Sequence, residues 1–286
     1  MKEIGIHVLP IWLNVGIALA VFAAALRAVP ADDARFLPRE RRLIGLSLVS
    51  IFVVTPAIAI AVVEWIDMPA QARLAIVALS FSIIAPALPH RLGDAEHRPY
   101  ANTLMLTVAF ASILAIPLLV DLMGRVTGHD YDAPPGEIAS YVGLILALPV
   151  ALGMAVRWRW RAFADRVTLR LTRIAFALTT IAVAIEVVLT LPAIWRLLDS
   201  GTVLGMTVFT VAAIGAGHLM GGPRPSDELV LALSSATRHP SVALTVATIN
   251  YPEHRFSSAL MLCLIVNAAV SAVYIRWHRR RSVTPR

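Results

Sequence analysis

The sequence predicts an all-α integral membrane protein with about nine transmembrane helices. Three observations carry the prediction. Of the 286 residues, 58% are hydrophobic and only 15% are charged, whereas soluble domains carry about 25% charged residues. The apolar residues come in blocks of about 20, the length that a helix needs to cross a bilayer. Short, arginine-rich loops separate these blocks.

The apolar blocks define the helices in chain order. The first block is too long for the apolar core of a signal peptide and lacks a clear cleavage site, so we expect it to be retained. No stretch between blocks is long enough for a soluble domain, so residues 1–286 are expected to form one transmembrane domain. The single cysteine, Cys263, excludes an internal disulfide. The expected spans are 4–26, 43–63, 73–89, 101–123, 138–156, 174–194, 202–220, 228–250 and 256–275.

The basic residues predict how these spans are oriented, because cytoplasmic loops carry an excess of lysine and arginine. Taken alternately, one set of loops and termini holds 19 of the 25 basic residues and the other set holds five. This asymmetry places the N-terminus outside and the C-terminus in the cytoplasm of a cell inner (plasma) membrane. Because the net charge of +7 sits at the ends of spans, we expect the lipid bilayer, and no nucleic acid, as a partner.

The eighth span has polar residues at its centre. Residues 234–240 read SSATRHP between two apolar runs. Pro240 has no N–H, so the carbonyl of Ala236 loses its helical partner, and the proline ring clashes with that turn. Arg238 adds a charge near the bilayer midplane, which costs about 2.5–3.5 kcal/mol on insertion scales. A broken helix and a charge at the same depth predict a polar site there.

The third span is also interrupted by proline. Pro86 and Pro89 free the carbonyls of Ser82 and Ala85 near its cytoplasmic end. A proline-interrupted span in each half of a membrane protein is typical of inverted-repeat transporters. We therefore expect spans 1–4 and 6–9 to be inverted repeats whose broken helices, spans 3 and 8, cross. The expected parts of the chain are a first half (1–123), a connecting span with its loops (124–173) and an inverted second half (174–286).

Two segments resemble the bile acid:sodium symporter family. Residues 231–247, LALSSATRHPSVALTVA, are similar to the second crossover of that family and carry the more specific resemblance. Residues 84–89, IAPALP, followed by 102–119, are similar to the first crossover. The resemblance covers most of the chain in span order. It implies a rigid core that holds the crossed helices, a second part called the panel, and secondary transport of a small organic anion.

The resemblance also identifies where sodium would bind, and the chain departs from the family there. In the well-known symporters the second crossover carries a glutamate and a glutamine that bind the ion, whereas Ser234 and Arg238 stand in those places here. Because a fixed cation repels a second one, we expect Arg238 to occupy the space of a sodium ion. The carrier would then have no cofactor and would be sodium-independent or driven by something else.

Arg238 is the leading candidate for the substrate site. A guanidinium binds carboxylates and sulfonates, and a charge inside a membrane span is a functional candidate by default. The alternative is a structural pair with Glu186 or with the freed carbonyls of the third span. His239 is a donor to the substrate, a titrating group for proton coupling, or a cap on freed carbonyls. Glu186, an acid in the sixth span, is the second candidate for ion coupling.

The remaining polar candidates can also be explained by structural roles alone. The hydroxyls next to Arg238 either line the substrate path or satisfy freed backbone groups. Asn14 and Asn267 are explained by hydrogen bonds between helices, and the glycines around His218 by close helix packing. The expected substrate-binding residues are Arg238, His239, Thr237, Ser234, Ser235, Pro240, Pro86 and Asn14.

The sequence contains no metal-ligand cluster, nucleotide-binding glycine loop or nucleophile elbow, so we expect no metal, no catalytic residue and no ATP-driven pump. The alternative to a carrier is a non-transporting sensor or a membrane-embedded enzyme on the same fold. An enzyme would need a paired acid and base near the break, and only His239 with Glu186 could serve.

Overall fold

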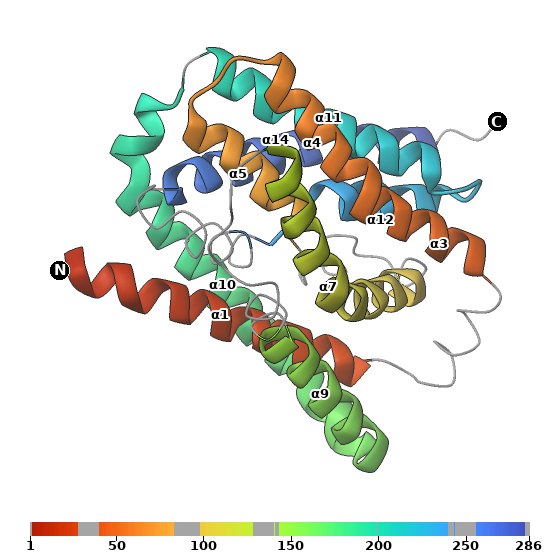
Figure 1. Ribbon diagram of the computed structural model, residues 1–286. Coiled ribbons are helices and arrows are strands. Elements are labelled where there is room, and N and C mark those ends of the chain that lie inside the picture. The colour runs from red at the N-terminus through yellow and green to blue at the C-terminus, as the bar shows by residue number, and fades with distance from the viewer. Residues whose placement is uncertain are drawn as a thin grey trace.

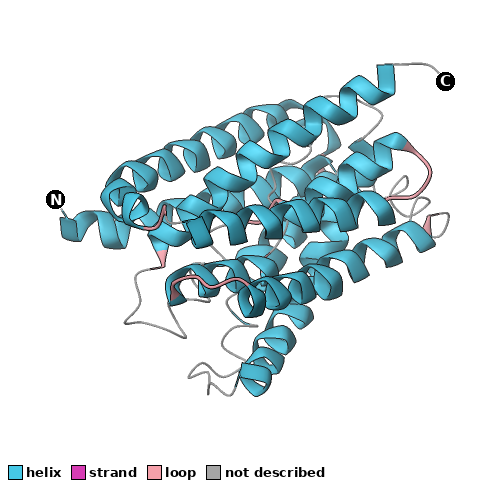
Figure 2. Ribbon diagram, turned by 90° about the horizontal axis from the view of Figure 1, so that it is seen from above, coloured by secondary structure: helices cyan, strands magenta, loops and turns pink. Residues whose placement is uncertain are grey.

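The structure, a computed structural model, describes residues 2–27, 40–82, 98–127, 140, 143–198, 200–239, 243 and 256–283. These residues form helices and the loops between them (Figure 2). The all-helical class that the composition predicts is confirmed. Pro86 and Pro240 lie outside the described residues, as does nearly all of the eighth span beyond His239.

Each expected span contains described helix. The first, third and fourth spans correspond to α1 (Lys2–Arg27), α5 (Ala70–Phe81) and α7 (Arg98–Thr127). The second span is made of α3 (Arg41–Val49), the π-helical turn η1 (Ser50–Val54) and α4 (Thr55–Trp65), which follow one another without a break. The other five correspond to the π-helical turn η3 (Gly143–Ala147) with α9 (Leu148–Arg159), then α10 (Arg161–Arg196), α11 (Ser200–Met220), α12 (Pro225–Ala236) and α14 (Ser257–Val283).

Several of these helices suit a bilayer by length and composition. Among the described residues, four helices are long and apolar enough to cross a membrane: Arg41–Trp65, Arg161–Arg196, Gly201–Met220 and Ser257–Arg281. Shorter apolar helices cover Asn14–Arg27, Ala70–Phe81 and Tyr100–Ile116. All of them overlap expected spans, so the helices fit a multi-pass membrane protein.

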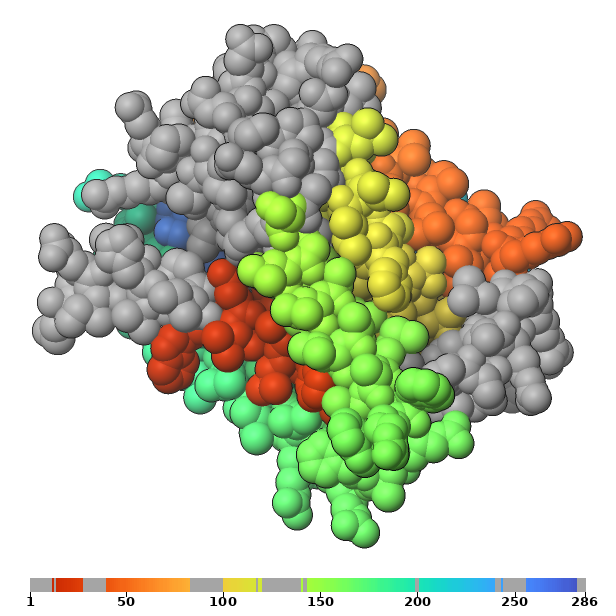
Figure 3. All heavy atoms as spheres, turned by 60° about the horizontal axis from the view of Figure 1, so that its bottom comes forward, coloured from red at the N-terminus to blue at the C-terminus, as the bar shows by residue number. Residues whose placement is uncertain are grey.

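The helices pack in two groups (Figure 1). In the first group, which we call the panel, α1 lies along α10 and α9. In the second group, the core, α11 packs on α12, α14 and α4, while α5 contacts α4 and α14. The groups join where α10 meets α14 and where η3 meets α7. Figure 3 shows the second junction, with the green α9 region between the red α1 and the yellow α7.

Helix α12 lies inside the core. Its residues 229–236 are all buried, and it contacts α11, α14, α7 and η1. The helix begins at Pro225, where the missing N–H costs nothing, and Asp227 and Glu228 favour the positive end of its dipole. Because protein surrounds α12, the unwound backbone at its end is sheltered from lipid, as backbone at membrane depth must be.

Two glycines allow α11 to approach α12 closely. A Cβ on Gly217 would lie 2.6 Å from the Cα of Ala232, and a Cβ on Gly221 would lie 2.9 Å from the backbone nitrogen of Glu228. The packing role expected for the glycines of the seventh span is confirmed at these two positions. It does not extend to Gly215, which has open space beside it.

Three helix boundaries differ from the sequence prediction. Helix α10 begins at Arg161 rather than at 174, because the charged stretch expected as a loop is rich in good helix formers such as arginine, leucine and alanine. Helix α5 ends at Phe81, and Ser82 already has extended backbone, whereas the span was expected to run to 89. Helix α14 runs to Val283 rather than to 275.

Candidate functional site

The ends of α5 and α12 meet inside the core. Ser82 and Thr237, the residues that follow the two helices, both have extended backbone. The Ser82 hydroxyl donates to the carbonyl of His239 at 2.5 Å, and Nη1 of Arg238 donates to the carbonyl of Ser82 at 2.9 Å. The two spans that carry the sequence interruptions are therefore joined where α5 and α12 end.

The Arg238 guanidinium connects three segments through their backbone carbonyls. Besides Ser82, Nη2 donates to the carbonyl of Ile51 at 3.0 Å, and Nε donates to the carbonyl of Ser235 at 3.2 Å. The residue is only 3% exposed. A guanidinium has five N–H donors, so these bonds leave one N–H on Nη1 and one on Nη2 for a further acceptor. Within the described residues, no carboxylate lies at ion-pair distance from this guanidinium.

The Ile51 carbonyl is available because the second span is irregular. The turn η1 has π-helical register over Ser50–Val54, in which each N–H bonds five residues back. In that register the donor to Ile51 would be Pro56, which has no N–H. The N–H and the hydroxyl of Thr55 both bond to the carbonyl of Ser50 instead. The proline thus leaves one carbonyl free to accept from Arg238.

Hydroxyl groups surround the end of α12. The Ser50 and Ser235 hydroxyls share a hydrogen bond of 2.8 Å, and the Thr55 hydroxyl lies 3.5 Å from the Ser235 carbonyl. The hydroxyl oxygens of Ser234 and Thr237 are buried and have no hydrogen-bond partner among the described residues. Because buried polar atoms are nearly always paired, these two hydroxyls have unused capacity to contact a ligand.

The last carbonyl of α12 is capped by the ninth span. Asn267 of α14 donates from Nδ2 to the carbonyl of Ala236 at 2.8 Å, and Ser271 lies 3.5 Å from its Oδ1. This is the interhelical hydrogen bond expected for Asn267. It means that the end of α12 is held by three elements, α14, α5 and η1.

The remaining candidates are distributed differently. The side chain of His239 is buried and takes part in an interaction, while its carbonyl accepts from Ser82. Glu186 lies on α10 and hydrogen-bonds to Ser257, not to Arg238. Asn14 lies half-buried on α1, in the panel, and also has a partner. Pro86 and Pro240 fall outside the described residues, and the substrate-binding roles of the whole set stay predictions.

Sequence reasoning missed the contribution of the second span. Ser50, Ile51 and Thr55 reach Ser235 and Arg238 across the core. The available signal was the Thr55-Pro56 pair, since a proline inside a span always leaves a carbonyl without its helical donor. The pair does not predict the contact with Arg238, because a free carbonyl does not by itself indicate which distant donor will reach it.

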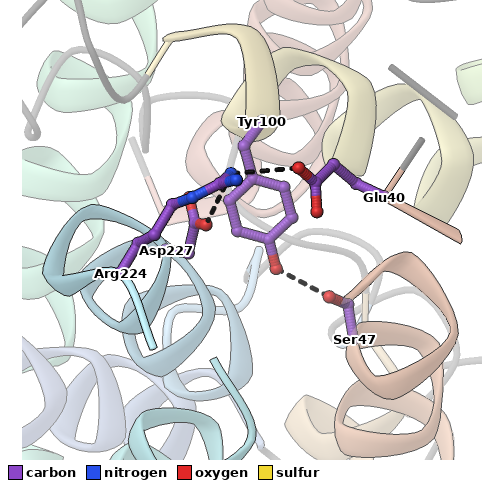
Figure 4. A network of polar contacts seen from close by, with 5 residues as sticks. All are labelled: Glu40, Ser47, Tyr100, Arg224 and Asp227. Atoms are coloured by element: carbon purple, nitrogen blue, oxygen red, sulfur yellow. Dashed lines mark hydrogen bonds and ion pairs between the residues drawn. The ribbon is translucent and has the colours of Figure 1, made fainter. Parts of the chain in front are cut away.

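A separate polar network joins the beginnings of α3, α7 and α12 (Figure 4). Nη1 of Arg224 lies 3.0 Å from Glu40 and 3.7 Å from Asp227, and the hydroxyls of Ser47 and Tyr100 lie 2.6 Å apart. The Arg224 side chain is 57% exposed, so its ion pairs add at most about 1 kcal/mol. The network shows that three helices of the core begin at the same end of the molecule.

The fold and this centre define a multi-pass helical membrane protein with a buried cation between helix ends. A model of the Sodium Bile acid symporter family matches residues 15–196, and the chain belongs to this family. The match covers the first six spans, where the sequence resemblance was less specific, and ends before α12. The resemblance at 231–247 therefore rests on those residues themselves. A comparison with curated proteins found no match.

Members of this family are transporters rather than enzymes, and family membership indicates a symporter-like membrane transporter. It agrees with the apolar, membrane-length helices of the core and panel.

Proposed function

We propose that the chain is a secondary carrier of a small organic anion, with its site at the interruption of α12. The observation that supports this most directly is the buried Arg238 guanidinium, which three carbonyls hold while two of its N–H groups have no acceptor among the described residues. Two N–H groups on different Nη atoms can bind a carboxylate or sulfonate by parallel bonds. The hydroxyls of Ser234 and Thr237, which have no partner within the described part of the chain, lie in the same stretch and add donors.

We propose further that Arg238 takes the place of a coupling cation. Carbonyl oxygens are the ligands that replace water around alkali ions in membrane proteins, and three of them converge on this guanidinium. A sodium ion about 4 Å from the guanidinium would be repelled by about 4 kcal/mol at an effective dielectric constant of 20. The carrier then needs no sodium. Glu186 and His239 are the titratable groups left for proton coupling.

The inverted repeat and the orientation belong to the same proposal. Helices α5 and α12 each end at the centre, and the next long helices in the chain are α7 and α14. Helix α1 begins and α14 ends at opposite ends of the molecule (Figures 1 and 2). This supports an N-terminus outside and a C-terminus in the cytoplasm of the inner membrane. Alternating access would come from motion of the core against the panel, since Arg238 is buried in this conformation.

The test is the thermal stability of the purified protein with carboxylates and sulfonates of increasing size, from acetate to taurocholate. Each anion is added in sodium, potassium and choline salts, and a ligand of the native state raises the Tm by mass action. We expect one class of anion to raise the Tm equally in all three salts, and proteoliposomes to take up the same anion. A rise that requires sodium would refute sodium independence. A rise without uptake would identify a sensor, and no rise with any anion would refute the anion site.

A further inference from the structure

We propose that the core carries a binding site for a divalent transition metal ion, zinc above all, formed by His218, Glu228 and His278. The three residues come from α11, α12 and α14, and one ligand atom of each lies within 4.8 Å of the others. The site lies at the end of α12 opposite to Arg238. It is independent of the anion site proposed above, and the sequence did not reveal it because the residues have no characteristic ligand spacing.

The two distances from Glu228 to the histidines fit an ion better than direct hydrogen bonds. Oε2 of Glu228 lies 3.6 Å from Nδ1 of His218 and 3.7 Å from Nε2 of His278, beyond the roughly 3.2 Å limit of an N–H···O bond. Zinc bonds to histidine and carboxylate ligands at about 2.0–2.2 Å, which puts the corners of a tetrahedron about 3.3–3.5 Å apart. Each of these two separations therefore needs to close by only a few tenths of an ångström around the metal.

The residue types also suit zinc. Two imidazoles and one carboxylate form the ligand set of known zinc sites that keep a fourth position for water or another ligand. The side chains of His218 and Glu228 are 22% and 27% exposed, and that of His278 is 7% exposed. An ion can thus reach the ligands from the surface, while the imidazoles are held in place by packing.

Neighbouring residues restrict the movement of the three ligands. Gly221 brings α11 against the backbone of Glu228, so these two helices cannot separate without losing close contact. The hydroxyl of Tyr274 lies 2.8 Å from Nδ1 of His218, the atom that faces Glu228. A metal ion on Nδ1 would displace that hydroxyl. Tyr274 therefore competes with the metal and is not one of its ligands.

The test uses the full chain in detergent, with any oligohistidine tag removed and metals stripped by a chelator. Isothermal titration with zinc chloride should show one zinc ion per chain, with a rise in Tm. Glu228→Gln and His278→Ala should each weaken binding by more than roughly 100-fold, the upper range for loss of an outer-shell partner. Glu64→Gln makes the same chemical change on an exposed residue of α4 and should bind like the wild type.

Tyr274→Phe separates a metal site from a simple polar cluster. It should bind zinc at least as tightly as the wild type, because it removes the competing hydroxyl. The proposal is overturned if the folded wild type binds no stoichiometric zinc, or if Glu228→Gln binds it with unchanged affinity. Should His278→Ala fail to fold, the nearly isosteric Glu228→Gln decides the question alone.

Discussion

Replacing Arg238 by alanine should convert a sodium-insensitive protein into one that sodium stabilises. The change removes the guanidinium from between the carbonyls of Ser82, Ile51 and Ser235. Hydroxyls of Ser234 and Thr237 are nearby in the chain and have no partner among the described residues. The variant therefore offers a buried, oxygen-lined space of the kind that an alkali ion can occupy.

The magnitude follows from what the substitution leaves behind. Three buried carbonyls lose their donor from Arg238, at a cost of roughly 1–3 kcal/mol each, and removal of a buried charge returns several kcal/mol of desolvation. We expect a net loss of about 2–4 kcal/mol in the absence of sodium. Sodium at ten times its dissociation constant would restore about 1.4 kcal/mol, or roughly 2–3 °C in Tm for a chain of this length.

The assay compares Tm values in sodium, potassium and choline chloride at one ionic strength. The matched control is Arg170→Ala, which removes an exposed arginine from α10. That variant should resemble the wild type in all three salts. Arg238→Lys keeps a positive charge at the centre and should also stay insensitive to sodium, although an ammonium cannot reproduce the planar fork of the guanidinium.

Two results would refute this reasoning. The first is a wild-type protein that sodium stabilises more than potassium or choline, because Arg238 would then not have replaced the ion. The second is a folded Arg238→Ala variant whose Tm is the same in all three salts. If Arg238→Ala does not fold, Arg238→Gln tests the same point with a neutral side chain that fills more of the space.

Three further predictions concern the same core. Gly217→Ala should lower stability by about 1–3 kcal/mol, because its Cβ would press on backbone that cannot move, whereas Gly215→Ala should not lower it; equal effects in urea unfolding would contradict this. Asn267→Leu should cost about 1–3 kcal/mol by uncapping the last carbonyl of α12, and an unchanged Tm would show that the cap is dispensable. Ser234→Glu combined with Arg238→Gln restores the acid and amide of the family's sodium site and should bind sodium in a calorimetric titration; no heat from the folded double variant would count against the alignment.

The sequence predicted local features of the fold well. Apolar block length located the spans, since each block had to be long enough to cross a bilayer. The proline rule predicted that the Ser82 carbonyl would lose its helical donor, and the structure gives that carbonyl to Arg238. The structural alternative named for Arg238, a bond to the third span, is the contact that the structure contains. The bond to Ser82 does not test whether Arg238 also binds an anion, so that role stays a prediction.

Long-range pairing could not be predicted in the same way. The bonds from Ser50 to Ser235 and from Arg238 to Ile51 join residues far apart in the chain. They depend on how α3, η1 and α4 lie against α12, and the apolar pattern does not determine this because these helices are hydrophobic on most faces. The proximity of His218 and His278 likewise depends on how their helices pack, so the apolar pattern could not predict it. A single sequence identifies polar residues within spans but not which of them meet.

The arrangement of helix ends explains how a buried arginine is stabilised without a carboxylate among the residues that the structure describes. Helices α5 and α12 both end beside the guanidinium, and the C-terminal end of a helix carries about half a negative charge. Two such ends together offset about one positive charge, so Arg238 is neutralised largely by backbone. If the side chain is removed, the same negative potential stays in place with its carbonyls unpaired. A sodium ion and the arginine are therefore alternative ways to satisfy one electrostatic requirement of the fold. This is the reason to expect that the alanine variant binds the ion that the wild type excludes.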